Sequence, residues 1–321
     1  MTTVWQKIPK PFFVQAPMED VTDTVFRQII KMAGEPDMYF TEFTNADGIV
    51  HGGSRYTAQR LQFLPKEKPL IAQIWGNNPD NYVTSCKLLV EMGYDGIDIN
   101  MGCPVRKVVK RGNCSGLIRN PKLAGELIQA AKEGAGKLPV SVKTRIGNDK
   151  IVTEEWIGFL LEQKLDAITV HARTSNEMTK VPVHAEEFGK AVKLRDSINP
   201  DTLIIANGDI MTREQGLDIV SKYHVDGIMI ARGLLHNPWV FNKNKKFEDI
   251  SVHEKLELLK KHVVLFESTW GKTKNFELMK KFYKAYINGF DKASEMRTEL
   301  VLLHGYNETI EKLNSLISEY K

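Results

Sequence analysis

The chain contains the run Leu203-Ile204-Ile205-Ala206, which is apolar throughout and leads into the polar turn Asn207-Gly208-Asp209. A strand with one face in water alternates apolar and polar residues, whereas a strand buried on both faces is a continuous apolar run. The run Ile228-Met229-Ile230 repeats this pattern and leads into Ala231-Arg232-Gly233. Both runs are therefore predicted to be strands of a parallel sheet that is covered on both faces.

Similar short runs precede these two, and amphipathic helical stretches lie between them. The predicted strands are Phe12–Val14, Met38–Phe43, Leu70–Ile74, Gly96–Asn100, Val140–Thr144, Ala167–His171, Leu203–Ala206 and Gly227–Ile230. The predicted helices are Thr22–Met32, Pro79–Met92, Thr153–Gln163, Glu186–Leu194 and Arg213–Lys222. This alternation predicts an α/β protein with a closed (β/α)8 TIM barrel. The alternative is a doubly wound open sheet, which usually carries a Gly-x-Gly-x-x-Gly turn after its first strand; Val14–Met18 has none.

The pattern changes after Trp239, because only helical periodicity is visible beyond that point. The chain is therefore predicted to consist of a barrel domain at 1–241, a polar linker at 242–250 and a small C-terminal all-α helical bundle at 251–321. The predicted helices of the bundle are Val252–Trp270, Phe276–Asn288, Lys292–Leu303 and Asn307–Tyr320.

The composition argues against disulfide-rich, zinc-binding and membrane-spanning classes of protein. The 321 residues carry a formal charge of only +4, which permits an anionic partner but does not require one. Three cysteines cannot build a disulfide framework, and no Cys-x-x-Cys pair suggests zinc, so no metal site is expected. No stretch is apolar for long enough to span a bilayer, and residues 1–10 lack a signal peptide. A cytoplasmic protein without a membrane partner is expected.

Polar or reactive residues follow nearly every predicted strand. In a parallel barrel the carboxyl ends of the strands and the loops after them build the active site. The residues found there are Pro17 with Met18, Glu42, Gln73, Asn100 with Cys103, Lys143 with Arg145, His171 with Arg173, Asn207-Gly208-Asp209, and Arg232-Gly233. Any one of them alone is more often structural, but together on one rim they predict an active site.

The last two turns predict a phosphate site, because the loops after the seventh and eighth strands usually hold phosphate in this fold. Glycine lets backbone N–H groups approach an anion, and Arg232 adds a charged fork. The alternative is a pair of tight turns with a surface arginine. Lys143, Gln73, Asn100 and His171 add groups that suit a flat, polar, phosphorylated cofactor such as flavin mononucleotide (FMN).

The three cysteines have different expected roles. Free cysteine is most often a small buried hydrophobe, and Cys86, within a predicted helix, fits that description. Cys103 lies between Gly102 and Pro104, on a constrained loop at the predicted rim, which favours a function. Cys114, in Gly112-Asn113-Cys114-Ser115-Gly116, is ambiguous, and a tight structural turn is the favoured interpretation.

Motifs across the barrel resemble those of the tRNA-dihydrouridine synthases. They are Ala16-Pro17-Met18 with Val21-Thr22-Asp23, Gln73-Ile74-Trp75-Gly76, Asp98-Ile99-Asn100-Met101-Gly102-Cys103-Pro104, Lys107-Val108, Lys143-Thr144-Arg145, His171-Ala172-Arg173-Thr174, Asn207-Gly208-Asp209-Ile210 and Ala231-Arg232-Gly233. They occur in the order of that family and cover the whole predicted barrel. The Asn-x-Gly-Cys-Pro run together with the later His-x-Arg-Thr is the specific part.

The resemblance implies that the barrel binds FMN and that the helical domain helps to bind tRNA. It implies that NADPH, with NADH left open, reduces FMN, that hydride passes to C6 of a uracil, and that Cys103 delivers a proton to C5. A thiol with a near-ordinary pKa suits that acid role. No family feature calls for a partner other than tRNA, and a monomer is expected.

The resemblance also assigns residues. Pro17, Met18 and Glu19 should border the flavin. Gln73 and Lys143, with His171 nearby, should bind its ring edge or ribityl chain. The residues expected at its phosphate end are Asn207, Gly208, Asp209, Ala231 and Arg232. Asn100 should contact the uracil, and Arg145 and Arg173 should serve the flavin or RNA phosphates. Apart from the resemblance, basic residues are candidates to bind the RNA backbone. They are Lys107, Lys110 and Arg111 near the mouth, and Lys280, Lys281, Lys284 and Arg297 on the helical domain, for which a solvated helix face is the alternative.

Two departures from the family pattern stand out. Glu19 takes a place where a small residue is common, and the run Met178–His184 replaces a tyrosine-glycine element and a tryptophan. That run is expected near the substrate, so the resemblance to the family does not indicate which uridine of the tRNA this chain would reduce. Two other functions remain as alternatives: a small-molecule FMN oxidoreductase of the dihydroorotate or dihydropyrimidine dehydrogenase type, and a non-catalytic RNA-binding protein.

Overall fold

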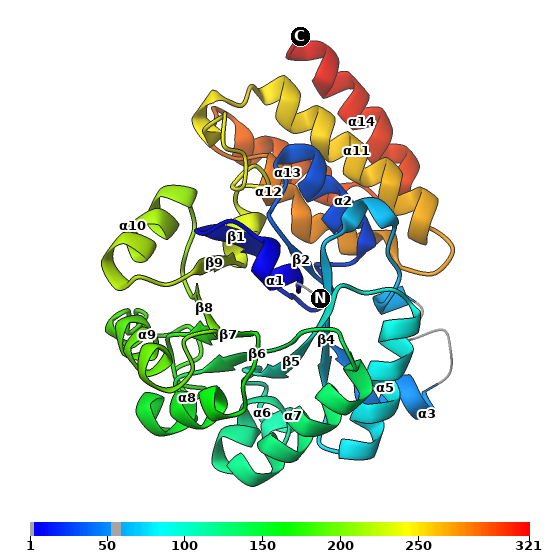
Figure 1. The fold of residues 1–321 in the computed structure, drawn as a ribbon. Helices are drawn as coiled ribbons and strands as arrows, with labels where there is room; N and C mark the ends of the chain where they lie inside the picture. Colours follow the sequence, from blue (N-terminus) through cyan, green and yellow to red (C-terminus); the bar gives the residue numbers. More distant parts are fainter. Residues whose placement is uncertain (1–2, 53–58) are drawn as a thin grey trace. The chain divides into compact units, whose positions relative to one another are not determined.

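The computed structural model describes residues 3–52 and 59–321, and its centre is a parallel sheet closed into a barrel (Figure 1). The strands are β1 (Phe12–Gln15), β2 (Tyr39–Phe40), β3 (Thr44–Asn45), β4 (Leu70–Trp75), β5 (Gly96–Met101), β6 (Val140–Arg145), β7 (Ala167–His171), β8 (Leu203–Asn207) and β9 (Gly227–Ile230). Their order round the sheet is β1-β9-β8-β7-β6-β5-β4-β2, and β3 also pairs with β4. The predicted TIM barrel is confirmed.

The barrel closes between β1 and β2 through a single parallel bridge, Val14 to Met38. The predicted strand Met38–Phe43 has the right place but not the right extent, because the chain forms two short pieces on either side of Thr41. Thr41 still donates its N–H to the carbonyl of Ile71 at 3.0 Å, but its hydroxyl donates to the carbonyl of Glu42 at 2.7 Å. That side-chain bond competes with the regular ladder at this point.

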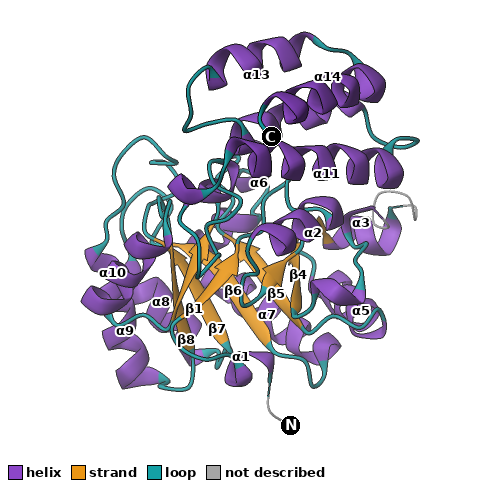
Figure 2. Cartoon of the chain, turned by 90° about the horizontal axis from the view of Figure 1, so that it is seen from above, coloured by secondary structure: helices purple, strands orange, loops and turns teal. Residues whose placement is uncertain are grey.

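Helices surround the strands, as Figure 2 shows for α8, α9 and α10 on one side and α3 and α5 on the other. The helices of the barrel part are α1 (Val4–Lys7), α3 (Ala46–His51), α5 (Pro79–Glu91), α6 (Arg106–Val109), α7 (Pro121–Ala135), α8 (Thr153–Glu162), α9 (Glu186–Ile198) and α10 (Arg213–Tyr223). A 3-10 turn, η2, spans Cys114–Arg119, and a shorter one, η1, spans Pro65–Glu67.

Helix α7 is absent from the sequence prediction. It begins with a clear signal, because Asn120 accepts a hydrogen bond from the N–H of Leu123 at 3.2 Å and Pro121 is the first helical residue. Asparagine at the cap and proline in the first turn are typical of a helix start. The signal was therefore present in the sequence.

The interior of the barrel at the amino ends of its strands is apolar. Trp5 of α1 packs there, with ring centroids 5.9 Å from Phe12 and 6.3 Å from Phe40. Ile71 and Met229 belong to the same buried cluster. In Figure 1, α1 is drawn within the ring of strands. This end of the barrel is therefore filled by packing, which leaves the carboxyl ends for polar groups.

By its contacts the chain divides into two units, and the second contains residues 24–36, 211–213 and 232–321. Its elements are α2 (Thr24–Ala33), η3 (Arg232–Leu235), η4 (Phe247–Asp249), α11 (Val252–Trp270), η5 (Phe276–Phe282), α12 (Tyr283–Tyr286), α13 (Ala293–Leu302) and α14 (Gly305–Glu319). The all-α character predicted for the C-terminal part is confirmed. The predicted helix Phe276–Asn288 is instead a 3-10 turn followed by the short α12.

The core of this second unit is aromatic and draws on α2. Phe26 stacks on Phe282 with centroids 5.2 Å apart, and His262 lies 4.8 Å from Phe282. The His262 Nδ1 and the Tyr286 hydroxyl are 2.8 Å apart. The sequence pattern placed the α2 segment in the barrel's helix series, because periodicity shows an apolar face but not the neighbour that covers it. The boundaries 1–241, 242–250 and 251–321 stay a prediction.

No helix within the described residues combines the length and the apolar character that crossing a membrane requires.

Candidate active site at the carboxyl ends of the barrel strands

The register of the sheet brings the predicted polar residues to neighbouring positions. Asn100 of β5 pairs with Lys143 of β6, and His171 of β7 pairs with Asn207 of β8. One layer further in, Gln73 of β4 pairs with Asp98 of β5. These side chains come from successive strands of one barrel, so five separate segments of sequence meet at one mouth.

Lys143 reaches Asn207 across β7. Its Nζ donates to the Oδ1 of Asn207 at 2.8 Å, and the Nδ2 of Asn207 donates to the carbonyl of Met229 at 2.9 Å. Burial, and then the neighbouring Arg145 guanidinium, lower the pKa of Lys143 to about 8, while Asp98 and Cys103 act in the opposite direction. A half-buried ammonium with one neutral partner keeps two donors free for an anion or a polar ligand.

The turn after β8 needs glycine at one position. Gly208 has φ +126°, and a Cβ built on it would lie 2.8 Å from Cγ1 of Val183 and 3.2 Å from Cδ2 of His171. L-residues rarely adopt that backbone conformation, and the space is too small for a methyl group. The backbone of Gly208 therefore lies close against the His171 ring.

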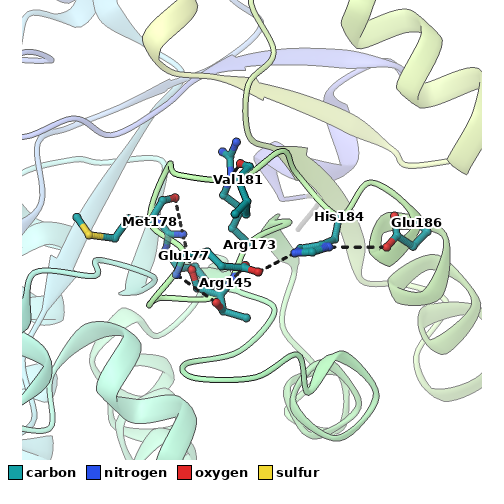
Figure 3. Close-up of polar contacts among 8 residues, drawn as sticks. Arg145, Arg173, Glu177, Met178, Val181, His184 and Glu186 are labelled. Atoms are coloured by element: carbon teal, nitrogen blue, oxygen red, sulfur yellow. Dashed lines mark hydrogen bonds and ion pairs between the residues drawn. The ribbon is translucent and has the colours of Figure 1, made fainter.

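Arg173 is buried and held by two partners. Its Nη1 donates to Oδ1 of Asp209 at 3.0 Å, and its Nη2 pairs with the other carboxylate oxygen. Its Nε donates to the carbonyl of Val181 at 2.7 Å (Figure 3). The side chain of Asp209 is therefore engaged by Arg173.

Arg145 connects two loops. Its Nε donates to the carbonyl of Gly102 at 2.8 Å, and its Nη1 donates to the carbonyl of Thr174 at 3.0 Å. The same Nη1 also donates to the carbonyl of Met178 at 3.4 Å (Figure 3). Burial lowers the pKa of Arg145 to about 10, against the opposing effect of Cys103. The guanidinium therefore joins the cysteine loop to the loop at 174–184.

The loop at 174–184 carries its own hydrogen-bonded pair, Glu177 and His184, which the sequence interpretation did not single out. Nε2 of His184 lies 2.8 Å from Oε1 of Glu177, and the N–H of Thr174 donates to the other oxygen of Glu177 at 2.7 Å. On its other side, His184 Nδ1 lies 3.9 Å from Glu186 (Figure 3). An acid and a histidine seven residues apart in a loop gave no periodic signal, so only the loop's path reveals the pair.

Cys103 sits on a loop that Asn100 holds. The backbone N–H groups of Gly102 and Cys103 both donate to Oδ1 of Asn100 at 3.0 Å. The thiol is partly exposed. The Cys114 thiol, hydrogen-bonded to it, lowers the pKa of Cys103 to about 7 against the opposing effect of burial, and the Val105 N–H and Arg145 assist. The pKa is thus lower than the near-ordinary value expected from sequence, which did not foresee the contact with Cys114.

The other two cysteines are buried. Cys86 lies inside α5, as expected, and burial raises its pKa to about 12. Cys114 opens η2 with φ +51°, so the favoured interpretation as a tight turn is confirmed. The contact with Cys103 and burial both raise the pKa of Cys114 well above its ordinary value. It therefore stays a neutral thiol and a hydrogen-bond donor.

The segment Pro17–Glu19 follows β1 in a hydrogen-bonded turn. The N–H of Met18 donates to the hydroxyl of Thr22 at 2.9 Å, and the N–H of Thr22 returns to the carbonyl of Met18 at 3.0 Å. The unusual Glu19 pairs with Arg60 at 2.5 Å. Burial raises the pKa of Glu19, and Arg60 opposes this effect. The charge at this position is therefore balanced within the protein.

Two predicted phosphate residues, Ala231 and Arg232, follow β9 directly. Ala231 is half-buried and ends the first unit, while Arg232 is exposed and opens η3 of the second unit. Among the candidate RNA contacts, Lys107, Lys110 and Arg111 on and after α6 are all exposed. Two others are engaged elsewhere: Lys280 pairs with Glu277 at 2.5 Å, and Arg297 donates to the carbonyl of Ile287 at 2.6 Å.

In the part of the chain that the structure describes, no three side chains of His, Cys, Asp or Glu are grouped to hold a metal ion.

Comparison with known proteins agrees with this geometry. The family model described as "Dihydrouridine synthase (Dus)" matches residues 14–320. A "Probable tRNA-dihydrouridine synthase" of Staphylococcus aureus (strain MRSA252) is 42% identical over 320 residues, which cover 99% of this chain and 95% of that protein. A "Probable tRNA-dihydrouridine synthase 2" of Bacillus subtilis (strain 168) is 44% identical over 319 residues, covering 98% and 97%.

Solved structures show a similar fold at low identity. Morphinone reductase aligns with a TM-score of 0.52 and 11% identity over 72% of this chain and 84% of its own. At this identity the likeness shows the fold alone. The match to the family model over residues 14–320, together with relatives above 40% identity over nearly the whole chain, shows that the chain belongs to the dihydrouridine synthase family.

Proposed function

We propose that this protein reduces the C5=C6 bond of uridines in tRNA to 5,6-dihydrouridine, with FMN as its cofactor and Cys103 as the proton donor. The observation that carries the proposal is the partly exposed Cys103 thiol, held by Asn100 beside Lys143 at the mouth of a barrel of this family. The relatives from Staphylococcus aureus and Bacillus subtilis are named as probable tRNA-dihydrouridine synthases, and we extend that substrate to this chain.

The residues at the mouth fit FMN. The Gly208 turn leaves no space for a Cβ beside His171, which suits a backbone that approaches a ligand closely. Lys143 provides a half-buried ammonium whose pKa burial lowers to about 8, and an anionic ligand would stabilise its charged form. Gln73, Lys143 and His171 would hold the ring edge and ribityl chain, and the backbone of Asn207–Asp209, with Ala231 and Arg232, the phosphate.

Bound FMN, once reduced by a nicotinamide nucleotide, supplies the hydride that C6 of the uracil receives. The protein then has to deliver a proton to C5, which a positioned acid does best when its pKa lies near the working pH. The Cys103 thiol, with a pKa of about 7, meets that condition and becomes a thiolate after the transfer. Arg145, which favours the charged form of Cys103, stabilises that thiolate.

A uridine inside folded RNA must leave its stack to reach this mouth. The exposed Lys107, Lys110 and Arg111 then attract the RNA backbone, which is the main source of affinity for nucleic acids. NADPH is the proposed reductant, with NADH as the alternative. We further propose that the protein acts as a monomer in the cytoplasm, where tRNA is found, and that the helical part at 251–321 contributes to tRNA binding.

The test is to incubate unmodified tRNA with the protein, FMN and NADPH and to map dihydrouridine by mass spectrometry. The Cys103→Ala variant should keep FMN bound and reducible by NADPH, but should form product at least ~100-fold more slowly. Cys86→Ala, which removes a thiol buried in α5, should keep the wild-type rate. Full activity of Cys103→Ala would contradict the acid assignment, and equal turnover of free uracil would favour a small-molecule reductase.

A further inference from the structure

A carboxylate lies beneath the proposed acid without touching the mouth. Asp98 of β5 is fully buried. Its Oδ2 accepts a hydrogen bond from Nε2 of Gln73 at 2.6 Å, and its Oδ1 accepts one from the hydroxyl of Ser141 at 2.6 Å. A buried carboxylate is costly unless such bonds compensate it, so its presence calls for an explanation.

The bonds continue from Asp98 to the cysteine loop. Oε1 of Gln73 accepts from Nδ2 of Asn100 at 3.0 Å. Oδ1 of Asn100 then accepts from the backbone N–H groups of Gly102 and Cys103, both at 3.0 Å. Three side chains on β4 and β5 therefore form one unbroken series that ends at the backbone of Cys103.

The direction of every bond in this series is determined from its two ends. Backbone N–H groups can only donate, so Asn100 must present its oxygen to the loop and its Nδ2 to Gln73. Gln73 must then present its oxygen to Asn100 and its Nε2 to Asp98. The last member must accept, and a carboxylate always offers an acceptor. An amide can be turned over by 180°, whereas Asp98 cannot reverse the direction of the series.

We propose that Asp98 is a positioning residue that sets the amide orientation of Gln73 and Asn100 and so places Cys103 for proton donation. The catalytic part of this proposal rests on the acid role proposed for Cys103. The uridine and FMN would meet Gln73 and Asn100 directly, while Asp98 acts only through them.

The proposal does not require Asp98 to be charged. Burial raises the pKa of Asp98 to about 6, although the bonds from Ser141 and Gln73 and the charge of Lys143 oppose this effect. When the carboxyl is protonated, the proton can lie on Oδ1 and be donated to Ser141. The Ser141 hydroxyl can then donate to the carbonyl of Ile97, which lies 3.4 Å away. Oδ2 still accepts from Gln73 in both states.

Two substitutions of Asp98 are therefore expected to have different effects. In Asp98→Asn the amide oxygen can accept from Gln73 while the amide nitrogen donates to Ser141, so the direction of the series is kept. In Asp98→Val the acceptor is lost and Nε2 of Gln73 has no partner, so only the backbone N–H groups of Gly102 and Cys103 still favour one amide orientation. Ser141→Ala is the matched control, because it removes one partner of Asp98 and leaves the contact with Gln73 intact.

Two measurements test the proposal on folded, FMN-loaded protein. The first is dihydrouridine formation in tRNA, which should fall about 100-fold in Asp98→Val, as expected for a misplaced catalytic group. It should stay within roughly threefold of wild type in Asp98→Asn and Ser141→Ala, where only one modest hydrogen bond changes. The fall should appear in kcat more than in KM for tRNA.

The second measurement is the pH dependence of Cys103 alkylation by iodoacetamide, followed by peptide mass spectrometry without any tRNA. In Asp98→Val the loop loosens, the contacts that lower the thiol pKa weaken, and the midpoint rises from about 7 toward the ordinary thiol value. Asp98→Asn should keep the wild-type pH midpoint of Cys103 alkylation. A thermal unfolding scan confirms that each variant is folded, and Asp98→Ala, which is smaller and also lacks an acceptor, replaces Asp98→Val if that variant unfolds.

An unchanged alkylation midpoint in the folded apolar variant would overturn the positioning role. Equal loss of activity in Asp98→Asn and Asp98→Val would overturn the argument from hydrogen-bond direction. Failure of the wild-type protein to form dihydrouridine would contradict the proposed function. The alkylation midpoints would still decide whether Asp98 positions the Cys103 loop.

Discussion

At the scale of single residues, the pair Cys103 and Cys114 determines the working pH. Cys114 donates to Cys103 and stays neutral itself, because its own pKa is well above the ordinary value. A proton donor works only while protonated, so activity should fall as the pH rises through the Cys103 pKa of about 7.

Cys114→Ala should move this alkaline limit upward. Without the Cys114 hydrogen bond the pKa of Cys103 rises toward its ordinary value, so the thiol stays protonated to higher pH. The measurement is the pH profile of kcat/KM for tRNA from pH 6 to 9, with Cys86→Ala as the control for loss of a thiol. A profile of Cys114→Ala that overlays the wild-type profile would contradict the role given to Cys114.

Lys143→Met should weaken FMN binding. Among the described residues the ammonium donates only to Asn207, so its remaining donors are available to a ligand at the mouth. Loss of a hydrogen bond from a charged group costs about 1.5–3 kcal/mol, which is about 10- to 100-fold in affinity. Titration of the apoprotein with FMN measures this loss of affinity. Lys137→Met, at an exposed position after α7, should bind FMN as the wild type does.

At the scale of elements, the turn after β8 is built for close approach. Gly208→Ala adds a methyl group 2.8 Å from Val183 and keeps an unfavourable φ. The free energy of unfolding should fall by ~1–3 kcal/mol, and FMN affinity should fall with it. Gly136→Ala is the matched control: its φ is +59°, but nothing lies within 4 Å of the added methyl group. That variant should lose stability without losing FMN affinity.

The loop at 174–184 is held by Glu177. Burial raises the pKa of Glu177, but the bonds from His184 and Thr174 outweigh this effect, and the net pKa is lowered. Because the pKa is lowered, the Glu177 carboxylate stabilises the folded protein at any pH above its unfolded-state pKa. This stabilisation is lost as the pH falls through the folded-state pKa of Glu177. The loop should therefore be well ordered at neutral pH and loosen only in acid.

Glu177→Gln should loosen this loop at neutral pH. Amide hydrogen exchange of residues 174–184 should accelerate about fivefold, as expected for the loss of one hydrogen bond that a carboxylate accepts. Glu186→Gln, whose carboxylate lies 3.9 Å from His184 and is largely exposed, should leave the exchange unchanged. Equal exchange in both variants would show that Glu177 does not hold the loop.

At the scale of the whole molecule, RNA binding should be electrostatic although the net charge is only +4. The double variant Lys107→Ala, Lys110→Ala removes two exposed charges on and next to α6. The slope of the logarithm of tRNA affinity against the logarithm of salt concentration should become less negative by about one for each phosphate contact that is removed. Lys137→Ala is the control. An unchanged salt slope in the double variant would exclude α6 from the RNA-binding surface.

The barrel and its polar rim could be predicted from the sequence because both are local patterns. Apolar runs mark strands such as β8, and the residues directly after them, such as Asn207, must lie at the rim. The partners of those residues could not be predicted in the same way. Arg173 faces Asp209 and Arg145 faces three carbonyls because of how the loops run, and no spacing encodes that path.

The grouping of α2 with the C-terminal helices was also hidden from the sequence. Its apolar face is visible as helical periodicity, but whether Phe26 meets a strand or Phe282 depends on the whole chain. The same limit applies to the Cys103–Cys114 contact, which joins two turns 11 positions apart.

The single bridge between β1 and β2 has a consequence for synthesis. β1 pairs along its full length only with β9, whose last residue is Ile230. A growing chain therefore makes β1 some two hundred residues before its main neighbour exists, which takes roughly 10 to 45 s at ribosomal speed. During that interval β1 has an unpaired edge on the β9 side, and the nascent protein is most vulnerable to aggregation until the ninth strand emerges.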